Sequence, residues 1–246
     1  MVPKTSTAFA TLLKSDFITQ WRNRRSVILV LLIPVIILIS WKTAVQKIGP
    51  TFVLSTCINI GLTAIGLMGY SNAIARDRDK GVFQRLRVAP VPTWCIMISR
   101  LLVQLAMILL LTVLVCVVGY QEDKIELTRQ GYILCFFAAL AGGALYLGLG
   151  QMIVGLVKNS ETVNSTSRLV YFVFIMVGMF GEMGILGDKI KDIVRWSPYG
   201  TVKTIIAASM QPALWNSQTN TALGVTLLYT AFFSYLGIKL FRWNAR

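Results

Sequence analysis

The sequence predicts an all-α membrane protein with six transmembrane helices, and three observations support this prediction. Of the 246 residues, 55% are hydrophobic and only 14% are charged, whereas soluble domains carry roughly 25% charged residues. Several uncharged stretches approach or exceed the about 20 helical residues that cross a hydrocarbon core. The basic residues, which give a formal net charge of +14, lie at the edges of these stretches, so a membrane surface explains them better than nucleic acid does.

The N-terminal segment predicts an amphipathic helix at residues 6–24. Four large apolar side chains recur every four residues and therefore share one face of the helix: Phe9, Leu13, Phe17 and Trp21. This pattern is typical of a helix that lies in the membrane interface, and contact with a cytoplasmic partner is a second interpretation. We expect no signal peptide, because no small-x-small cleavage site follows the first apolar run.

Six apolar stretches supply the predicted spans. We expect them at about residues 26–44, 52–74, 95–119, 132–157, 168–186 and 220–240. Pro34 should kink the first span, because proline removes one backbone hydrogen bond. The fourth span carries small residues four apart, such as Ala138 with Gly142 and Ala144 with Gly148, which allow neighbouring helices within one subunit to approach closely.

The basic residues also predict the orientation. With six spans both termini lie on one side of the membrane, and that side holds sixteen of the 24 lysines and arginines against eight on the other. The positive-inside rule therefore places both termini in the cytoplasm.

Several chemistries are excluded by what the chain lacks. It has no histidine, and its four cysteines lie in or beside apolar runs without a CxxC pair, so we expect neither a zinc site nor a disulfide framework. No GxxxxGK[ST] loop is present to bind a nucleotide. Glu182 is the only acid near a span, which leaves no carboxylate pair for coupling to an ion gradient. If the protein pumps a substrate, the energy must come from another polypeptide.

A charged amphipathic segment at residues 76–92 joins the second and third predicted spans. Gly81 allows a sharp break, and a short helix follows whose apolar face is formed by Val82, Phe83 and Leu86. Such a helix suits docking in the groove of a soluble domain. A basic interfacial loop would give the same pattern, so the residues alone leave both interpretations open.

The same segment carries a family resemblance. Residues 77–91, Asp-Arg-Asp-Lys-Gly-Val-Phe-Gln-Arg-Leu-Arg-Val-Ala-Pro-Val, resemble the acid-Arg-acid-x-Gly-x-apolar-x-x-Leu-x-x-x-Pro signature of type-2 ABC exporter permeases. The resemblance is to the daunorubicin-resistance-like bacterial permeases and, more distantly, to the eukaryotic G-subfamily. Residues 158–161 and 193–200 also resemble family elements. Asp79 departs from the pattern, since the family usually has glutamate there.

The resemblance implies a single transmembrane domain over residues 1–246, with short outer re-entrant helices after the fifth span. It implies that the chain pairs with a second permease subunit, identical or paralogous, and with two cytoplasmic ATPase subunits that use ATP and Mg. The chain itself would bind no cofactor and would not be an enzyme. The implied ATPase-coupling residues are Arg76, Asp77, Arg78, Asp79, Gly81, Val82, Phe83, Arg85, Leu86 and Pro90.

The resemblance further implies ATP-driven alternating access in the plasma (inner) membrane, through a cavity lined by the second and fifth spans. The candidate path residues are Asn59, Thr63, Leu67, Phe172, Ile175, Met176 and Met179. Apolar, aromatic and methionine walls suit a hydrophobic or amphiphilic substrate such as a drug, an antibiotic or a lipid. These positions would equally serve helix packing. A polysaccharide or peptide exporter, or a channel or scaffold without an ATPase, are the alternatives, although no ring of polar residues typical of a channel is visible.

Overall fold

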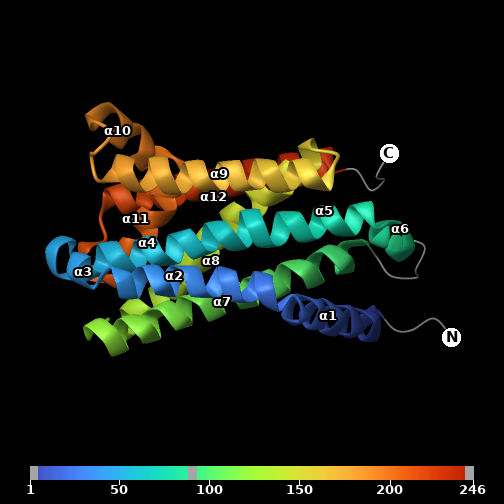
Figure 1. Cartoon of the computed structure of the whole chain (residues 1–246), viewed down its shortest axis with the longest axis horizontal. Coiled ribbons are helices and arrows are strands. Elements are labelled where there is room, and N and C mark those ends of the chain that lie inside the picture. The colour runs from blue at the N-terminus through green and yellow to red at the C-terminus, as the bar shows by residue number, and fades with distance from the viewer. Residues whose placement is uncertain (1–4, 88–92, 242–246) are drawn as a thin grey trace.

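The structure, a computed structural model, describes residues 5–87 and 93–241. Within them the side chains of residues 5, 25, 26, 29, 44, 85–87, 93 and 94 are not described. The described chain is helical throughout and contains no strand, which confirms the all-α prediction. Figure 1 shows the long helices running roughly side by side as one bundle.

The helices follow one another with short connections. In chain order they are α1 (Thr5–Arg22), α2 (Arg24–Ser40), α3 (Lys42–Ile48), α4 (Pro50–Thr63), the π-helix η1 (Ala64–Tyr70), α5 (Ser71–Asp79), α6 (Val82–Arg87), α7 (Thr93–Asp123), α8 (Arg129–Leu156), α9 (Ser160–Glu182), α10 (Asp188–Trp196), α11 (Pro198–Met210), the 3₁₀ turn η2 (Pro212–Leu214) and α12 (Ser217–Leu240).

Five helices of the described chain are long and apolar enough to cross a membrane: Pro50–Asp79, Cys95–Asp123, Arg129–Leu156, Ser160–Glu182 and Ser217–Leu240. They correspond to the second to sixth predicted spans. The count of six is not confirmed, because α2 has 17 residues and ends before Trp41. A helix of that length rises about 26 Å, less than the about 30 Å of the hydrocarbon core.

Helix α8 lies at the centre of the bundle, with α12, α11, η1, α7 and α4 packed around it. Its small residues make this possible. A Cβ atom on Gly142 would lie 2.4 Å from Val202 of α11, and one on Gly148 would lie 2.8 Å from the Ser234 hydroxyl of α12. The expectation that the small residues of the fourth span pack within one subunit is therefore confirmed.

The second span contains a π-helical stretch where it crosses α8. A Cβ atom on Gly150 would lie 2.4 Å from the carbonyl oxygen of Gly66, so the two backbones are in direct contact. A π-helix has wider turns than an α-helix and changes which side chains share a face. The face of the second span that points outward therefore shifts within η1.

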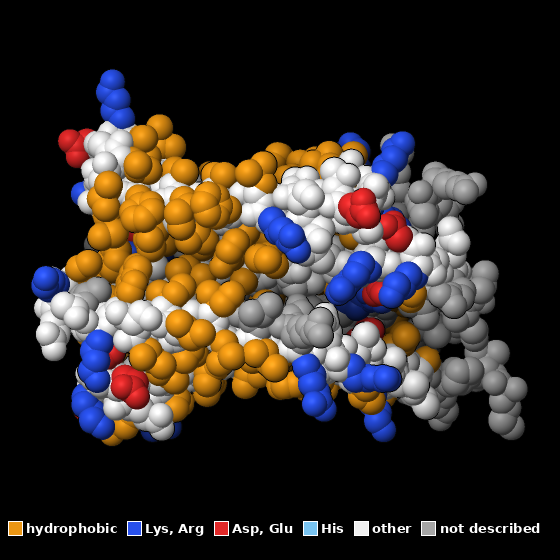
Figure 2. Space-filling model, in the orientation of Figure 1, with side chains coloured by type: hydrophobic (Ala, Val, Ile, Leu, Met, Phe, Trp, Pro, Cys, Tyr) orange, Lys and Arg blue, Asp and Glu red, His pale blue; other side chains and the backbone are white. Residues whose placement is uncertain are grey.

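The bundle has two distinct ends (Figure 1). One end gathers α1, α6 and the last turns of α5 and α12, and we call it the α6 end; α3 and α10 lie at the opposite end, the α10 end. Figure 2 shows hydrophobic side chains gathered over the middle of the visible face and charged side chains mainly toward the two ends. This distribution is that of a protein embedded in a bilayer.

Helix α1 packs along α7 at the α6 end. The Ser99 hydroxyl donates a hydrogen bond to the Asp16 carboxylate, and burial raises the pKa of Asp16, although this hydrogen bond opposes the shift. Two members of the predicted apolar face, Phe17 and Trp21, are 44% and 42% exposed. They are available to lipid, as an interfacial helix requires.

Candidate functional site: the elbow and the groove beside α9

The charged segment forms a sharp bend, the elbow, which we define as residues 76–87. Helix α5 ends at Asp79, and Gly81 follows with a φ of 67°, a left-handed conformation that favours glycine. The N–H of Gly81 donates to the carbonyl oxygen of Arg78 at 3.0 Å. The expected break at Gly81 is confirmed, and α6 starts at the next residue.

Phe83 fastens α6 to the bundle. Its side chain is fully buried, and its ring packs edge-on against Phe241, with 5.6 Å between the centroids. The Arg100 guanidinium lies 4.8 Å from the Phe83 centroid and also pairs with Asp77 of α5. Phe83 was predicted to belong to a face that a partner contacts, but it points into the subunit.

Arg78 grips the end of α8. It is 2% exposed, and its guanidinium donates hydrogen bonds to the carbonyl oxygens of Val154 at 2.7 Å, Val157 at 2.8 Å and Lys158 at 2.6 Å. The last carbonyls of a helix lack partners within it and attract cations. Arg78 therefore satisfies the C-terminus of α8 from the elbow.

Asp79 holds the start of α9. Its carboxylate accepts a hydrogen bond from the backbone N–H of Ser160 at 3.2 Å, and the neighbouring Asn159 side chain accepts one from Glu161 N–H at 2.8 Å. Both acceptors satisfy the free N–H groups of a helix N-terminus. The elbow is thus bonded to the end of α8 and to the beginning of α9 by two consecutive residues.

A groove of about 730 Å³ runs between α2, the η1–α5 segment and α9. Its apolar lining includes Val30, Ile33, Ala64, Met68, Tyr171 and Phe172, and its polar lining includes Asn23, Asn72, Arg76, Ser160, Glu161, Asn164 and Arg168. Two residues connect this groove to the elbow. Arg76 belongs to the elbow, and Ser160 is bonded to Asp79 of the elbow. The groove and the elbow therefore form one continuous site.

Comparison with known proteins identifies the family to which this site belongs. The family model of the ABC-2 family transporter proteins matches residues 42–239, which covers all five spanning helices and the elbow. The chain belongs to the ABC-2 transporter family. It is a multi-pass transmembrane component of an ABC transporter, and its family implies association with an ABC ATPase. A search of curated protein sequences found no match.

Family membership confirms the type-2 ABC permease resemblance. The roles of the individual elbow residues stay predictions. Of the ten coupling candidates, Arg78 and Phe83 are buried in the permease, Arg76 and Asp79 are exposed, and Val82 is half-buried. The side chains of Arg85 and Leu86, and all of Pro90, lie outside the described residues.

The predicted path residues of the second span lie inside the permease subunit. Asn59, Thr63 and Leu67 are fully buried. The Asn59 amide donates to the carbonyl oxygen of Tyr199 at 3.1 Å and accepts from the Tyr146 hydroxyl at 2.9 Å. Asn59 therefore holds α4 to α8 and α11. Contact of the three residues with a substrate stays a prediction.

The predicted path residues of α9 are divided. Phe172 is 60% exposed and lines the groove. Ile175 is buried against Ile60 and Tyr199, and Met176 and Met179 are half-buried. The structure brings only Phe172 of the seven candidates into the groove.

Sequence reasoning missed the residues of the second span that do line the groove, Ala64, Met68 and Asn72. Ala64 and Met68 lie in η1, where the wider π-helical turn changes which side chains face outward. An all-apolar stretch gives no periodicity from which that change can be read. The asparagines Asn72 and Asn164 could have indicated this face, because both are polar residues in the second and fifth spans. In the structure the Asn72 amide nitrogen lies 3.4 Å from the Asn164 side-chain oxygen.

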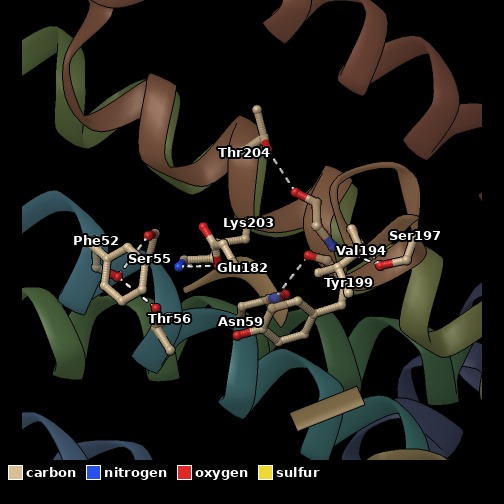
Figure 3. Close-up of polar contacts among 11 residues, drawn as sticks. Phe52, Ser55, Thr56, Asn59, Glu182, Val194, Ser197, Tyr199, Lys203 and Thr204 are labelled. Atoms are coloured by element: carbon tan, nitrogen blue, oxygen red, sulfur yellow. Dashed lines mark hydrogen bonds and ion pairs between the residues drawn. The ribbon is translucent and has the colours of Figure 1, made fainter. Parts of the chain in front are cut away.

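A second polar cluster fastens α9 at the α10 end (Figure 3). Lys203 of α11 is 2% exposed, and its ammonium group bonds to the carboxylate of Glu182, the last residue of α9. The same ammonium lies 3.2 Å from the centroid of the Phe52 ring of α4. Burial lowers the pKa of Lys203 to about 8, a shift that the carboxylate of Glu182 opposes.

Sequence reasoning treated Lys203 as one of the basic residues outside the membrane. The available signal was its position inside an otherwise uncharged run, residues 196–210 after Arg195. A lysine in such a run needs a partner. Its partner, Glu182, was recognised as the only acid near a span, but the pairing depends on α10 and α11 turning back beside α9, which no local pattern shows.

Proposed function

We propose that this permease is the membrane-crossing subunit of an ATP-driven exporter of the daunorubicin-resistance-like type, which exports hydrophobic or amphiphilic compounds such as drugs or antibiotics. In this proposal two permease subunits, identical or paralogous, associate with two ATPase subunits that bind ATP and Mg. The transporter works by alternating access in the plasma (inner) membrane. The elbow and both termini face the cytoplasm.

The observation that carries the proposal is the double attachment of the elbow. Arg78 holds the end of α8, and Asp79 holds the start of α9. Helix α9 lines the groove through Ser160, Asn164, Arg168 and Phe172. A push on α6 by an ATPase would therefore reach a wall of the groove through hydrogen bonds and one rigid helix.

Helix α2 completes the proposed set of six spans. It packs against α4 and α7, and its exposed side chains Ile28, Leu32, Ile36 and Ile39 suit contact with lipid. Its buried residues Val27, Val30, Val35 and Leu38 form the opposite face. A local thinning of the bilayer accommodates a helix a few ångströms short.

The groove supports the proposed substrate class. It is lined by apolar side chains on α2, η1 and α9 and by amides and charged groups toward the elbow. Apolar walls combined with convergent polar groups are typical of sites for small molecules, and a groove with an apolar part and a polar part suits an amphiphilic one. A polar rim of this composition gives such a compound a place for its polar part.

The test uses the permease reconstituted with its ATPase in vesicles, with daunorubicin as transported probe. Arg78→Gln removes the charge that grips three carbonyl groups, and charged hydrogen bonds contribute roughly 1.5–3 kcal/mol. We expect transport per ATP hydrolysed to fall at least about tenfold, since about 1.4 kcal/mol is a factor of ten. ATPase binding should persist.

Lys158→Gln is the matched control, because the Lys158 side chain is exposed while its backbone carbonyl remains available to Arg78. This variant should transport normally. A thermal unfolding midpoint confirms that Arg78→Gln is folded, and Asp79→Ala provides a second break in the same connection. Normal coupling in both elbow variants, or transport by the permease without any ATPase, would overturn the proposal.

A further inference from the structure

A second cavity lies on the side of α8 where α7 and α12 pass. Both helices pack on α8 but hardly on each other, and between them a furrow of about 560 Å³ remains. This volume is within the range of about 300–1,000 Å³ that small-molecule sites have. Its walls include Met97, Leu101 and Leu105 of α7 and Ile238 of α12, with Ala144 of α8 as part of the floor.

The length of the furrow suits a hydrocarbon chain. It follows α12 from Thr230 to Phe241, a helical rise of about 16 Å, and it lies between two helices that span the membrane. Lipid is therefore the medium next to it. An apolar gap left empty forfeits dispersion contacts along its whole length, so an acyl chain that enters gains them.

One polar group interrupts this apolar surface. The Gln151 side chain lines the furrow, and its residue is 8% exposed. Its carbonyl oxygen accepts a hydrogen bond from the Tyr70 hydroxyl at 2.9 Å. Among the described residues, the only hydrogen bond of the Gln151 side chain is this one to its carbonyl oxygen, which leaves the amide nitrogen as a donor at the furrow. An amide donor within a mainly apolar furrow lacks water as a partner once lipid fills the furrow, so the furrow favours a ligand that brings an acceptor.

The depth of Gln151 indicates which acceptor. It lies within two turns of the end of α8, at the level where Arg78 grips the Val154 carbonyl, and therefore near the boundary of the hydrocarbon core. The ester carbonyl groups of a glycerophospholipid lie at this boundary and can only accept hydrogen bonds. Their chemistry matches the free amide donor.

We propose that the furrow between α7 and α12 is a binding site for one acyl chain of a glycerophospholipid from the leaflet at the α6 end, with an ester carbonyl accepting a hydrogen bond from the Gln151 amide. The bound lipid contacts Phe241, whose ring packs on Phe83 of α6. It therefore supports the residue that anchors the elbow. That the lipid affects coupling rests on the proposed function; the binding site does not.

Binding is measured on the purified full-length permease in detergent, incubated with dioleoylphosphatidylethanolamine and analysed by intact-complex mass spectrometry. Ala144→Phe fills the floor of the furrow. Ala231→Phe is the matched control, because Ala231 is exposed on α12 and does not line the furrow. We expect wild type and Ala231→Phe to retain one lipid per chain and Ala144→Phe to retain at least about tenfold less.

Leu101→Trp, which fills the furrow from α7, is the second variant if Ala144→Phe unfolds. Equal retention by the folded furrow variants and Ala231→Phe overturns the site and leaves only nonspecific annular lipid. The Gln151 contact is tested in a Tyr70→Phe background, so that no tyrosine hydroxyl is left unpaired. Tyr70→Phe/Gln151→Leu should retain at least about fivefold less lipid than Tyr70→Phe, and equal retention overturns the ester contact.

The effect on the elbow is read from the ATPase rate of the assembled transporter at increasing phospholipid. Wild type and Ala231→Phe should be stimulated by lipid, whereas Ala144→Phe should not. If Ala144→Phe loses the lipid but its ATPase rate responds to phospholipid as that of wild type does, the effect on coupling is overturned and the binding site stands. If the permease binds no ATPase, the proposed function fails, and the mass measurement still decides the lipid site.

Discussion

At the scale of single residues, the permease uses buried charges as fasteners. Arg78 and Lys203 are each 2% exposed, yet they hold different partners. Arg78 binds three backbone carbonyls with a planar, branched guanidinium, a geometry that a lysine cannot supply. Lys203 meets one carboxylate and one aromatic ring, which suits a compact ammonium. The end of α8 beside the elbow and the Glu182 end of α9 are therefore each held by a buried basic residue.

The ion pair at the α10 end predicts a non-additive pair of substitutions. Glu182→Gln leaves the buried Lys203 without a counter-charge, and breaking a buried pair on one side costs up to about 3–5 kcal/mol. Because the Glu182 side chain is 34% exposed, we expect about 2 kcal/mol, a thermal midpoint roughly 4–8 °C lower. Adding Lys203→Met should recover most of the loss. An additive double variant in the thermal unfolding assay would contradict this pairing.

At the scale of elements, the sequence predicted the features that depend on a segment's own residues. It did not predict the features that depend on contact with another segment. Five of the six predicted spans were found because hydropathy is local, and the break at Gly81 was found because turn chemistry is local. The start of α9 at Ser160 was placed eight residues late, since its first turns are polar and resemble a loop. The N-terminus of α9 is capped by Asp79, whose carboxylate accepts a hydrogen bond from Ser160 N–H and which lies 81 positions away in the sequence.

The candidate site was predicted less well for the same reason. The sharp break at Gly81 was predicted correctly. The coupling roles of Phe83 and Arg78 stay predictions, and the sequence did not show that these side chains contact Phe241 and the end of α8. In an entirely apolar span, no amphipathic pattern distinguishes a groove-lining face from a packed one. Asn59 was placed in the path because the family resemblance lines the path with the second span, and its partners in the structure are Tyr146 and Tyr199.

The conformation of Gly81 predicts which substitutions the elbow accepts. Its positive φ costs a β-branched residue roughly 1–2 kcal/mol, while asparagine tolerates this region. A Cβ atom there meets only the Gln84 side chain, at 3.5 Å, so a clash plays no part. We expect Gly81→Val to reduce co-purification of the ATPase severalfold and Gly81→Asn to keep it near wild type. Equal yields in a pull-down would show that the backbone conformation of the elbow is unimportant.

At the scale of the whole molecule, the two ends of the bundle predict different chemical accessibility. The α6 end carries α6 and the link at Lys158, and the α10 end carries the exposed Asp192 (Figure 1). The four native cysteines are all buried, so introduced cysteines can be labelled selectively. In intact cells, a membrane-impermeant maleimide should label Asp192→Cys at once and Lys158→Cys only after permeabilisation. The reverse order would contradict the proposed orientation.

The grip of Arg78 on α8 has an evolutionary consequence. The guanidinium recognises main-chain carbonyl groups, which every amino acid possesses, so replacing the side chains of Val154, Val157 or Lys158 leaves the contact intact. Homologous permeases are free to diverge at these positions without a compensating change at the arginine. A chimaera that exchanges residues 154–158 between relatives should therefore keep the contact between Arg78 and the end of α8.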